Sequence, residues 1–313
     1  MNIKSRRSYV VWLLSRPSWM SLFFALSLYL PSYSQEAFLG ISLGGANYQG
    51  DLQDKILTLD GMTPGIGFNI LYAPNNRFSL SAELFRGVLS GSDAKPGSRN
   101  QSRNLQFVTQ LIDASIAGRL NFYNNRDFIF IPYATAGATL FYVDPYTYDT
   151  DRHRVYLYPM STEGQGLPGY SHVPSHHTLN GAILFGGGVE MRITKKIRMD
   201  IEVGWRKTFT DYIDDVSGDY PVFRDLLSAR GPDAVQYSYR GDEVSGGSLL
   251  YPSGTARGNA ARDDWYHMVS IRLRYSFRSW DLDNVNRKYL MRNTGWPYNL
   301  KRVKKGNGLK PCD

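Results

Sequence analysis

One short run of the chain is rich in carboxylates that could bind a metal ion. Asp211, Asp214, Asp215 and Asp219 lie close together in the sequence, and carboxylate oxygens are the ligands that Ca²⁺ prefers. Their spacing lacks both the alternating ligand positions and the glycine of a known calcium loop. We therefore favour a solvated turn that orders the end of a strand over a calcium site.

Histidines gather in a second segment, which contains His153, His172, His176 and His177. Imidazole nitrogens bind Zn²⁺ and other transition metals, so two or three of these side chains could form a site. Proline and glycine residues among them leave their relative geometry undefined, and a polar surface loop is the simpler interpretation. The sequence therefore predicts no metal site and no cofactor.

Alternating side chains near the end of the chain indicate which elements must position these loops. Between Trp265 and Phe277, apolar or aromatic residues alternate with polar ones, among them Arg272 and Arg274. A period of two is that of a β-strand, and this run is long enough to cross a bilayer, with an aromatic residue at each end. Because the pattern recurs upstream, the sequence predicts a membrane β-barrel.

Eight segments show this alternation. The predicted strands cover about 36–46, 62–73, 77–90, 105–122, 128–143, 178–193, 197–212 and 265–278. Their connections are alternately short and long, as in outer-membrane barrels, which have short periplasmic turns and long extracellular loops. The long ones are 47–61, 91–104, 144–177 and 213–264. The predicted fold class is all-β, an eight-stranded antiparallel transmembrane barrel of the outer membrane with both termini in the periplasm.

One face of each predicted strand carries charges that cannot face lipid. An arginine on the lipid side at mid-depth would cost about 2 to 4 kcal/mol, so these side chains must point inward, where opposite charges can pair. The predicted interior set is Glu83, Arg119, Glu190, Arg192, Asp200, Glu202, Arg206, Arg272 and Arg274. Because side chains fill a barrel of this size, we expect no diffusive pore. Pairing explains buried charges more simply than a proton or ion path does.

The amino terminus has the pattern of a signal peptide. Basic residues precede an apolar stretch at 19–30, and a small-x-small sequence follows at 32–34. The apolar stretch has about 12 residues, where about 20 are needed to span a bilayer, so we expect cleavage before Gln35. The expected organisation is a signal peptide at 1–34, a barrel at 35–278 and a basic periplasmic extension at 279–313.

The distribution of charge points to a partner for this extension. The formal net charge is +8, which could suggest nucleic acid, but the excess lies at the two ends and the segment between them is nearly neutral. We therefore expect no nucleic-acid partner. Aromatic residues within the extension favour docking to a protein over a disordered solubilising tail. The residues assigned to partner binding are Trp296, Tyr298, Lys301, Arg302, Lys304, Lys305 and Cys312.

Several loop motifs resemble those of a known family. They are Gly44–Leu52, Phe209–Tyr220, Gly231-Pro232, and Arg257-Gly258-Asn259 ahead of Asp263–Tyr266. In this order they resemble the PorG-like outer-membrane proteins of Bacteroidetes-type bacteria, over essentially the whole mature chain. Two roles stay open for four residues of these motifs, a structural one at the barrel rim and the binding of an outside partner. The four are Tyr212, Asp214, Asp215 and Tyr220.

The resemblance implies a fold, a partner and a role. PorG-like proteins look like small OmpA- or OmpX-type barrels linked to type IX protein secretion, where they contact the periplasmic ring of PorK and PorN. It therefore implies a non-enzymatic barrel that anchors or scaffolds a periplasmic ring through its extension. Extensions in the family end basic with a cysteine next to a proline, as Pro311-Cys312 does here, and we hypothesise an intermolecular disulfide through Cys312. A paralogue that serves another envelope complex would share these features.

An enzyme at the barrel rim is the alternative of a different class. Outer-membrane lipases, acyltransferases and proteases place Ser, His and Asp at the loop rim, and such an enzyme would act on lipid or peptide. No spacing in this chain singles out a nucleophile, a base and an orienting group. The sequence therefore favours a protein that is not an enzyme.

Overall fold

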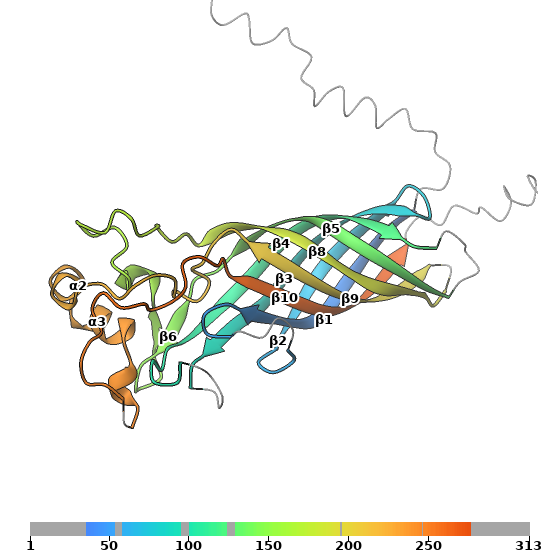
Figure 1. Cartoon of the computed structure of the whole chain (residues 1–313). Helices are drawn as coiled ribbons and strands as arrows, with labels where there is room; N and C mark the ends of the chain where they lie inside the picture. The colour runs from blue at the N-terminus through green and yellow to red at the C-terminus, as the bar shows by residue number, and fades with distance from the viewer. Residues whose placement is uncertain are drawn as a thin grey trace, which may run out of the picture.

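Eight long strands form a closed antiparallel barrel that carries loops and short helices at one end (Figure 1). The computed structural model describes residues 36–53, 58–94, 100–123, 129–194, 196–245 and 247–276. The expected signal peptide, and the extension with all of its assigned partner-binding residues, lie outside the described residues. Among the described residues, no helix has both the length and the apolar character needed to cross a membrane.

The barrel strands follow one another around the wall. They are β1 (Glu36–Gln49), β2 (Thr63–Ala73), β3 (Phe78–Ser92), β4 (Gln106–Asn121), β5 (Phe130–Tyr142), β8 (Leu179–Arg192), β9 (Ile197–Thr208) and β10 (Trp265–Ser276). Each pairs antiparallel with the next. The barrel closes where β10 pairs with β1, in a register that runs from Phe38 opposite Ser276 to Gln49 opposite Trp265. The predicted fold class is confirmed.

Strand ends near the long loops differ from the prediction. The seventh predicted strand reaches residue 212, but β9 ends at Thr208. The Thr208 hydroxyl donates to the carbonyl of Asp264 at 2.6 Å and lies 2.9 Å from the carbonyl of Thr210. The first strand runs to Gln49 and not 46, because Trp265 still pairs with it there. These differences arise where the chain turns over the barrel mouth.

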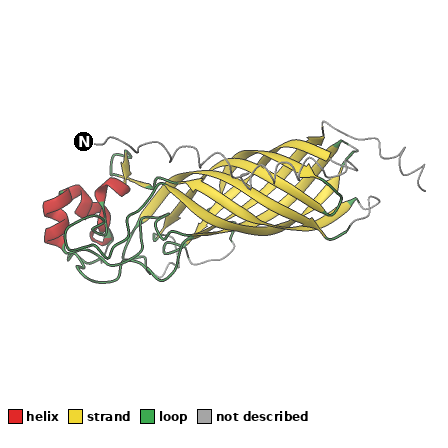
Figure 2. Ribbon diagram, turned by 90° about the horizontal axis from the view of Figure 1, so that it is seen from above, coloured by secondary structure: helices red, strands yellow, loops and turns green. Residues whose placement is uncertain are grey.

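The third and fourth long loops contain structure that the alternation did not predict. In the third, β6 (Tyr146–Tyr148) and β7 (Arg154–Tyr156) form a hairpin, and a 3-10 turn, η1, covers Tyr158–Met160. The fourth contains α2 (Phe223–Arg230), α3 (Pro232–Ser238) and a second 3-10 turn, η2 (Gly241–Glu243). Gly231 separates the two helices with a φ of 87°, a left-handed backbone that favours glycine. Figure 2 shows these helices gathered beyond one end of the barrel, and we call the folded loops at this end the cap.

The outward face of the barrel is an apolar belt. On β1, for example, Leu39, Ile41 and Leu43 are 45%, 43% and 56% exposed, whereas the intervening residues Gly40 and Ser42 lie against neighbouring side chains. Exposed aliphatic and aromatic side chains recur on the remaining barrel strands, so the wall offers lipid a continuous apolar surface. The backbone groups of the wall are paired between strands, as a bilayer requires.

The barrel interior has two zones. Toward the cap it is apolar, with Phe85, Phe107, Leu111, Phe141 and Met268 in one cluster that continues into the loops. Toward the other end it is filled by buried arginines and carboxylates. The boundary between lipid and interior follows directly from the period of two along each strand.

Candidate functional site

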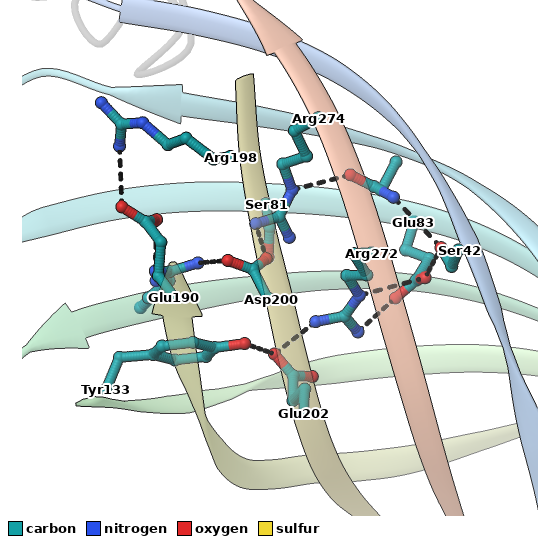
Figure 3. Close-up of polar contacts among 12 residues, drawn as sticks. Ser42, Ser81, Glu83, Tyr133, Glu190, Arg198, Asp200, Glu202, Arg272 and Arg274 are labelled. Carbon is teal, nitrogen blue, oxygen red and sulfur yellow. Dashed lines mark hydrogen bonds and ion pairs between the residues drawn. The ribbon is translucent and has the colours of Figure 1, made fainter. Parts of the chain in front are cut away.

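Arg272 on β10 lies between two carboxylates inside the barrel. Its Nη2 is 2.6 Å from Oε2 of Glu83 on β3, and its Nη1 pairs with Glu202 on β9. The hydroxyl of Tyr133 donates to Glu202 at 2.9 Å, and the hydroxyl of Ser42 donates to Glu83. Figure 3 shows these side chains converging from several strands. Each carboxylate therefore accepts from more than one donor, which buried charges need.

Asp200 on β9 connects this group to the next. Arg274 pairs through Nη1 with one of its oxygens, and Nη1 of Arg119 lies 3.4 Å from the other. Arg274 also donates from Nε to Asn69 Oδ1 at 2.8 Å, and Asn69 donates to Ser42 at 3.1 Å. Asn69 and Ser42, which the sequence interpretation did not include, are thus neutral links within the charged network.

Glu190 on β8 completes the network near the end of the barrel where β1 begins. Nη2 of Arg119 lies 2.6 Å from it, Nη1 of Arg198 lies 3.2 Å from it, and Nε of Arg192 lies 3.5 Å from it. Arg198 also pairs with Glu36. The side chain of Arg192 is 18% exposed, so it lies at the edge of the network.

A separate ion pair lies closer to the cap. Nε of Arg206 is 3.1 Å from Oδ2 of Asp113 on β4, and the hydroxyl of Tyr266 donates to the same oxygen at 2.8 Å. Asp113 was absent from the predicted interior set. It lies six residues before Arg119 on the same strand, an even spacing that places both side chains on the same face. The alternation along β4 therefore indicates that Asp113 faces inward.

The described interior leaves little free space at the charged end. A cavity among Glu36, Asn76, Asn121 and Arg198 has a volume of about 10 Å³, which is about the room needed for one water molecule. Arginines and carboxylates from opposite walls meet across the axis, and the apolar cluster fills the other zone.

The rim of the barrel holds a second set of buried carboxylates. The hydroxyl of Tyr48 donates to Asp214 Oδ2 at 2.5 Å and lies 3.2 Å from Asp264 Oδ1. The second oxygen of Asp214 accepts the backbone N–H of Val216 at 2.9 Å, and the second oxygen of Asp264 accepts the backbone N–H of Ile213 at 2.9 Å. Asp214 and Asp264 are 1% and 0% exposed. The expectation of a solvated turn was therefore wrong for Asp214, because the chain folds inward over the barrel mouth.

Burial makes these rim carboxylates weak acids. Burial raises the pKa of Asp214 and of Asp264 well above the ordinary value. The carboxylate of Asp51 raises the pKa of Asp214 further, and the carboxylate of Asp214 raises the pKa of Asp264 further. Burial raises the pKa of the partly exposed Asp211 to about 9. The rim is thus a place where protons are held near neutral pH.

Asp215 belongs to a different contact that joins the third and fourth loops. Nη2 of Arg257 lies 3.7 Å from Asp215, and Nη1 lies 2.9 Å from Glu163. Thr162 donates to Asp215 at 2.5 Å, and Tyr212 donates to Glu163 at 3.2 Å. Burial raises the pKa of Asp215 to about 7, against the opposing effect of Arg257. Asp215, which is fully buried, likewise does not lie in a solvated turn.

Tyr220 and Asp219 complete the loop motif. The ring of Tyr220 is 4% exposed and packs edge-on against Tyr239 and Tyr251, each with centroids 5.8 Å away. Asp219 is exposed and pairs through its backbone with Ala256. Tyr212, Asp214, Asp215 and Tyr220 thus all lie buried within the cap.

The histidines of the third loop do not converge. His153 is exposed and lies 3.3 Å from Asp149, His172 stacks on Tyr170, and Nε2 of His176 contacts the carbonyl of Tyr158 at 2.8 Å. Within the described ranges, no three His, Cys, Asp or Glu residues are placed to hold a metal ion.

Comparison with known proteins gives likeness at the level of the fold. No family model matches the sequence, and no curated protein matches it. Neisserial surface protein A is 8% identical, with a TM-score of 0.39, and the match covers 78% of this chain and 100% of that one. OprG from Pseudomonas aeruginosa is 7% identical, with a TM-score of 0.39 and coverage of 79% and 97%.

A third similar structure is Ail of Yersinia pestis, in complex with the heparin analogue sucrose octasulfate. It is 8% identical, with a TM-score of 0.35 and coverage of 78% of this chain and 97% of that one. At these identities and TM-scores, none of the three bears on the role of this chain. What the described residues establish is a closed eight-stranded barrel of the outer-membrane type, with a paired charged interior and a folded cap.

Proposed function

We propose that this protein is a non-enzymatic outer-membrane barrel that anchors a periplasmic ring of a protein secretion machine through residues 279–313. The observation that carries the proposal is the filled, ion-paired interior around Arg272, Asp200 and Glu190. A barrel occupied by its own side chains offers no route for solutes and serves as a rigid membrane body. Its activity then lies in what it holds in place.

The topology supports the use of the carboxyl-terminal extension as the attachment. β10 ends at Ser276 opposite Phe38 near the start of β1, at the end of the barrel away from the cap. The chain therefore continues from the side opposite the long loops, which is the periplasmic side if those loops are extracellular. The basic and aromatic residues of the extension, and the resemblance of the loop motifs to PorG-like proteins, favour a periplasmic ring of PorK- and PorN-like proteins as the partner.

Deletion of residues 284–313 tests this proposal. We expect a barrel that still shows heat-modifiable electrophoretic mobility, no longer co-purifies with ring proteins, and causes a secretion defect. A full-length control in which Lys301, Arg302, Lys304 and Lys305 are replaced by alanine separates loss of charge from loss of length. Ring proteins that co-purify equally with the deleted protein would contradict the proposal, and a rim enzyme would show little change on deletion.

Cys312→Ser tests whether the attachment is covalent. If Cys312 bridges to a ring protein, a non-reducing gel of envelope fractions shows a high-mass band for the native chain, and the band disappears in Cys312→Ser. Absence of such a band from the native chain would refute the bridge while leaving non-covalent docking to be judged by the deletion.

A further inference from the structure

The cap contains a hollow of about 510 Å³ between the first, second and fourth long loops. We call it the loop hollow. Its size falls in the range of small-molecule pockets, roughly 300 to 1,000 Å³. Residues that the argument uses from its lining are Asp51, Arg103, Tyr220, Tyr239, Ala256 and Arg257. Neither the charged interior nor the proposed attachment through the extension involves this hollow.

Buried carboxylates outside the lining fix and neutralise the two arginines of the loop hollow. Arg103 makes a bidentate contact with Asp93, at 2.7 and 2.9 Å, and also donates to the carbonyl of Arg257. Arg257 pairs with Glu163 at 2.9 Å. An anionic ligand would have to compete with these buried carboxylates, and Asp51 adds a further carboxylate to the lining. The charge of the hollow therefore disfavours an anionic ligand.

Tyr220 presents an unused hydrogen-bonding group to the loop hollow. Its side chain is 4% exposed, and its ring is fixed between Tyr239 and Tyr251. No described residue bonds to its hydroxyl, and this oxygen is not among the fully buried unpaired atoms of the described residues, so it remains accessible. The hydroxyl is thus a donor and acceptor that a ligand in the hollow would satisfy.

The rest of the lining combines apolar platforms with amides and hydroxyls. Tyr239 and Pro252 are partly exposed and offer apolar ring faces, whereas Ser102 and Asn259 are exposed and polar. Asp51 Oδ2 accepts the backbone N–H of Asn259 at 2.8 Å, which orders this side of the hollow. A sugar has the matching chemistry, because it presents hydroxyl groups at its edge and C–H groups on its faces. We propose that the loop hollow binds a neutral saccharide.

Calorimetric titration of the full-length protein with neutral saccharides tests this inference. The probes are maltose, lactose, mannobiose and chitobiose, and the detergent must be an amine oxide, because maltoside and glucoside detergents would occupy the site. We expect saturable binding of at least one probe. Ala256→Trp, which fills the hollow from its exposed wall, should weaken that binding at least about tenfold, and Tyr220→Phe, which removes one hydrogen bond, about 2- to 10-fold.

Ala260→Trp is the matched control, since Ala260 is exposed nearby and does not line the hollow. It should bind as the native chain does. Heat-modifiable mobility of each variant checks that its barrel is folded. If Ala256→Trp disturbs the packing of the cap, Tyr220→Phe, which keeps the aromatic ring, still tests the inference. Failure of all four probes to bind, equal binding by Ala256→Trp in a folded protein, or binding of galacturonate or inorganic phosphate in place of the neutral probes would overturn the inference.

Discussion

The barrel interior and the rim of the cap both bury carboxylates, but the partners of these carboxylates differ. Inside the barrel, Glu83 pairs with Arg272 and Asp200 pairs with Arg119 and Arg274, mostly across the barrel axis. At the rim, Asp214 and Asp264 face the hydroxyl of Tyr48, backbone N–H groups and each other. The membrane-embedded part therefore depends on fixed charges of both signs, whereas the rim depends on retained protons.

The largest expected effect comes from Asp200→Ala inside the barrel. Asp200 separates Arg119 from Arg274, so its removal leaves two buried cations without their shared carboxylate. We expect a loss of about 3 to 5 kcal/mol in the free energy of unfolding, measured by urea unfolding in lipid vesicles with tryptophan fluorescence. Asp219→Ala at the exposed part of the cap is the control and should change it by less than about 0.5 kcal/mol. Equal effects for the two substitutions would remove the distinction between interior and loops.

A smaller but sharper test uses the isolated pair of Arg206 and Asp113. Arg206→Met alone leaves Asp113 buried without its cation and should cost about 3 kcal/mol or more. Adding Asp113→Leu should recover much of that loss, because two apolar side chains can replace a buried ion pair at similar volume. A double variant whose loss equals the sum of the two single losses would show that the two side chains do not act as a pair.

At the rim, the expected effect is a dependence on pH. The pKa values of Asp211, about 9, and Asp215, about 7, are raised in the folded cap, whereas an aspartate in an unfolded segment has a pKa of about 4. The folded cap therefore binds protons more tightly, and its stability is greatest at acidic pH and falls as pH rises from about 4 through these raised values. The barrel interior gives no such prediction.

Hydrogen exchange of residues 211–217, corrected for the intrinsic rate at each pH, measures this effect. Protection should decrease from pH 5 to pH 9, a range chosen to span the raised values. Asp214→Asn, which is neutral at every pH and keeps one acceptor oxygen for either Tyr48 or Val216, should show a shallower decrease. Protection that increases with pH would show that the rim carboxylates are charged in the folded cap.

The strands could be predicted because lipid imposes a rule on every residue of the wall. Ile201 faces outward and Asp200 and Glu202 face inward, and any shift of one residue would expose charge to lipid. The same alternation also indicated that Asp113 faces inward, but the interpretation missed this residue, which is the single acid of β4. Contacts such as that of Arg119 with Glu190 and Asp200 depend on which strands lie across the axis, and no single strand shows this.

The cap could not be predicted in the same way. Asp214 and Asp215 have the sequence appearance of a polar turn, yet their partners Tyr48 and Arg257 lie far from them along the chain. The helices α2 and α3 are short and are held by loop contacts, so no long periodic pattern marks them. Tertiary contacts, and not local propensity, thus determine the conformation of the cap.

Conductance of the full-length protein in a planar lipid bilayer tests whether the barrel has a pore. Paired arginines and carboxylates, together with the apolar cluster, fill the barrel and leave a membrane body without a pore. We predict no steady conductance above that of the bare bilayer for protein whose folding is verified by heat-modifiable mobility. A steady, ohmic conductance that scales with the number of inserted molecules would contradict it.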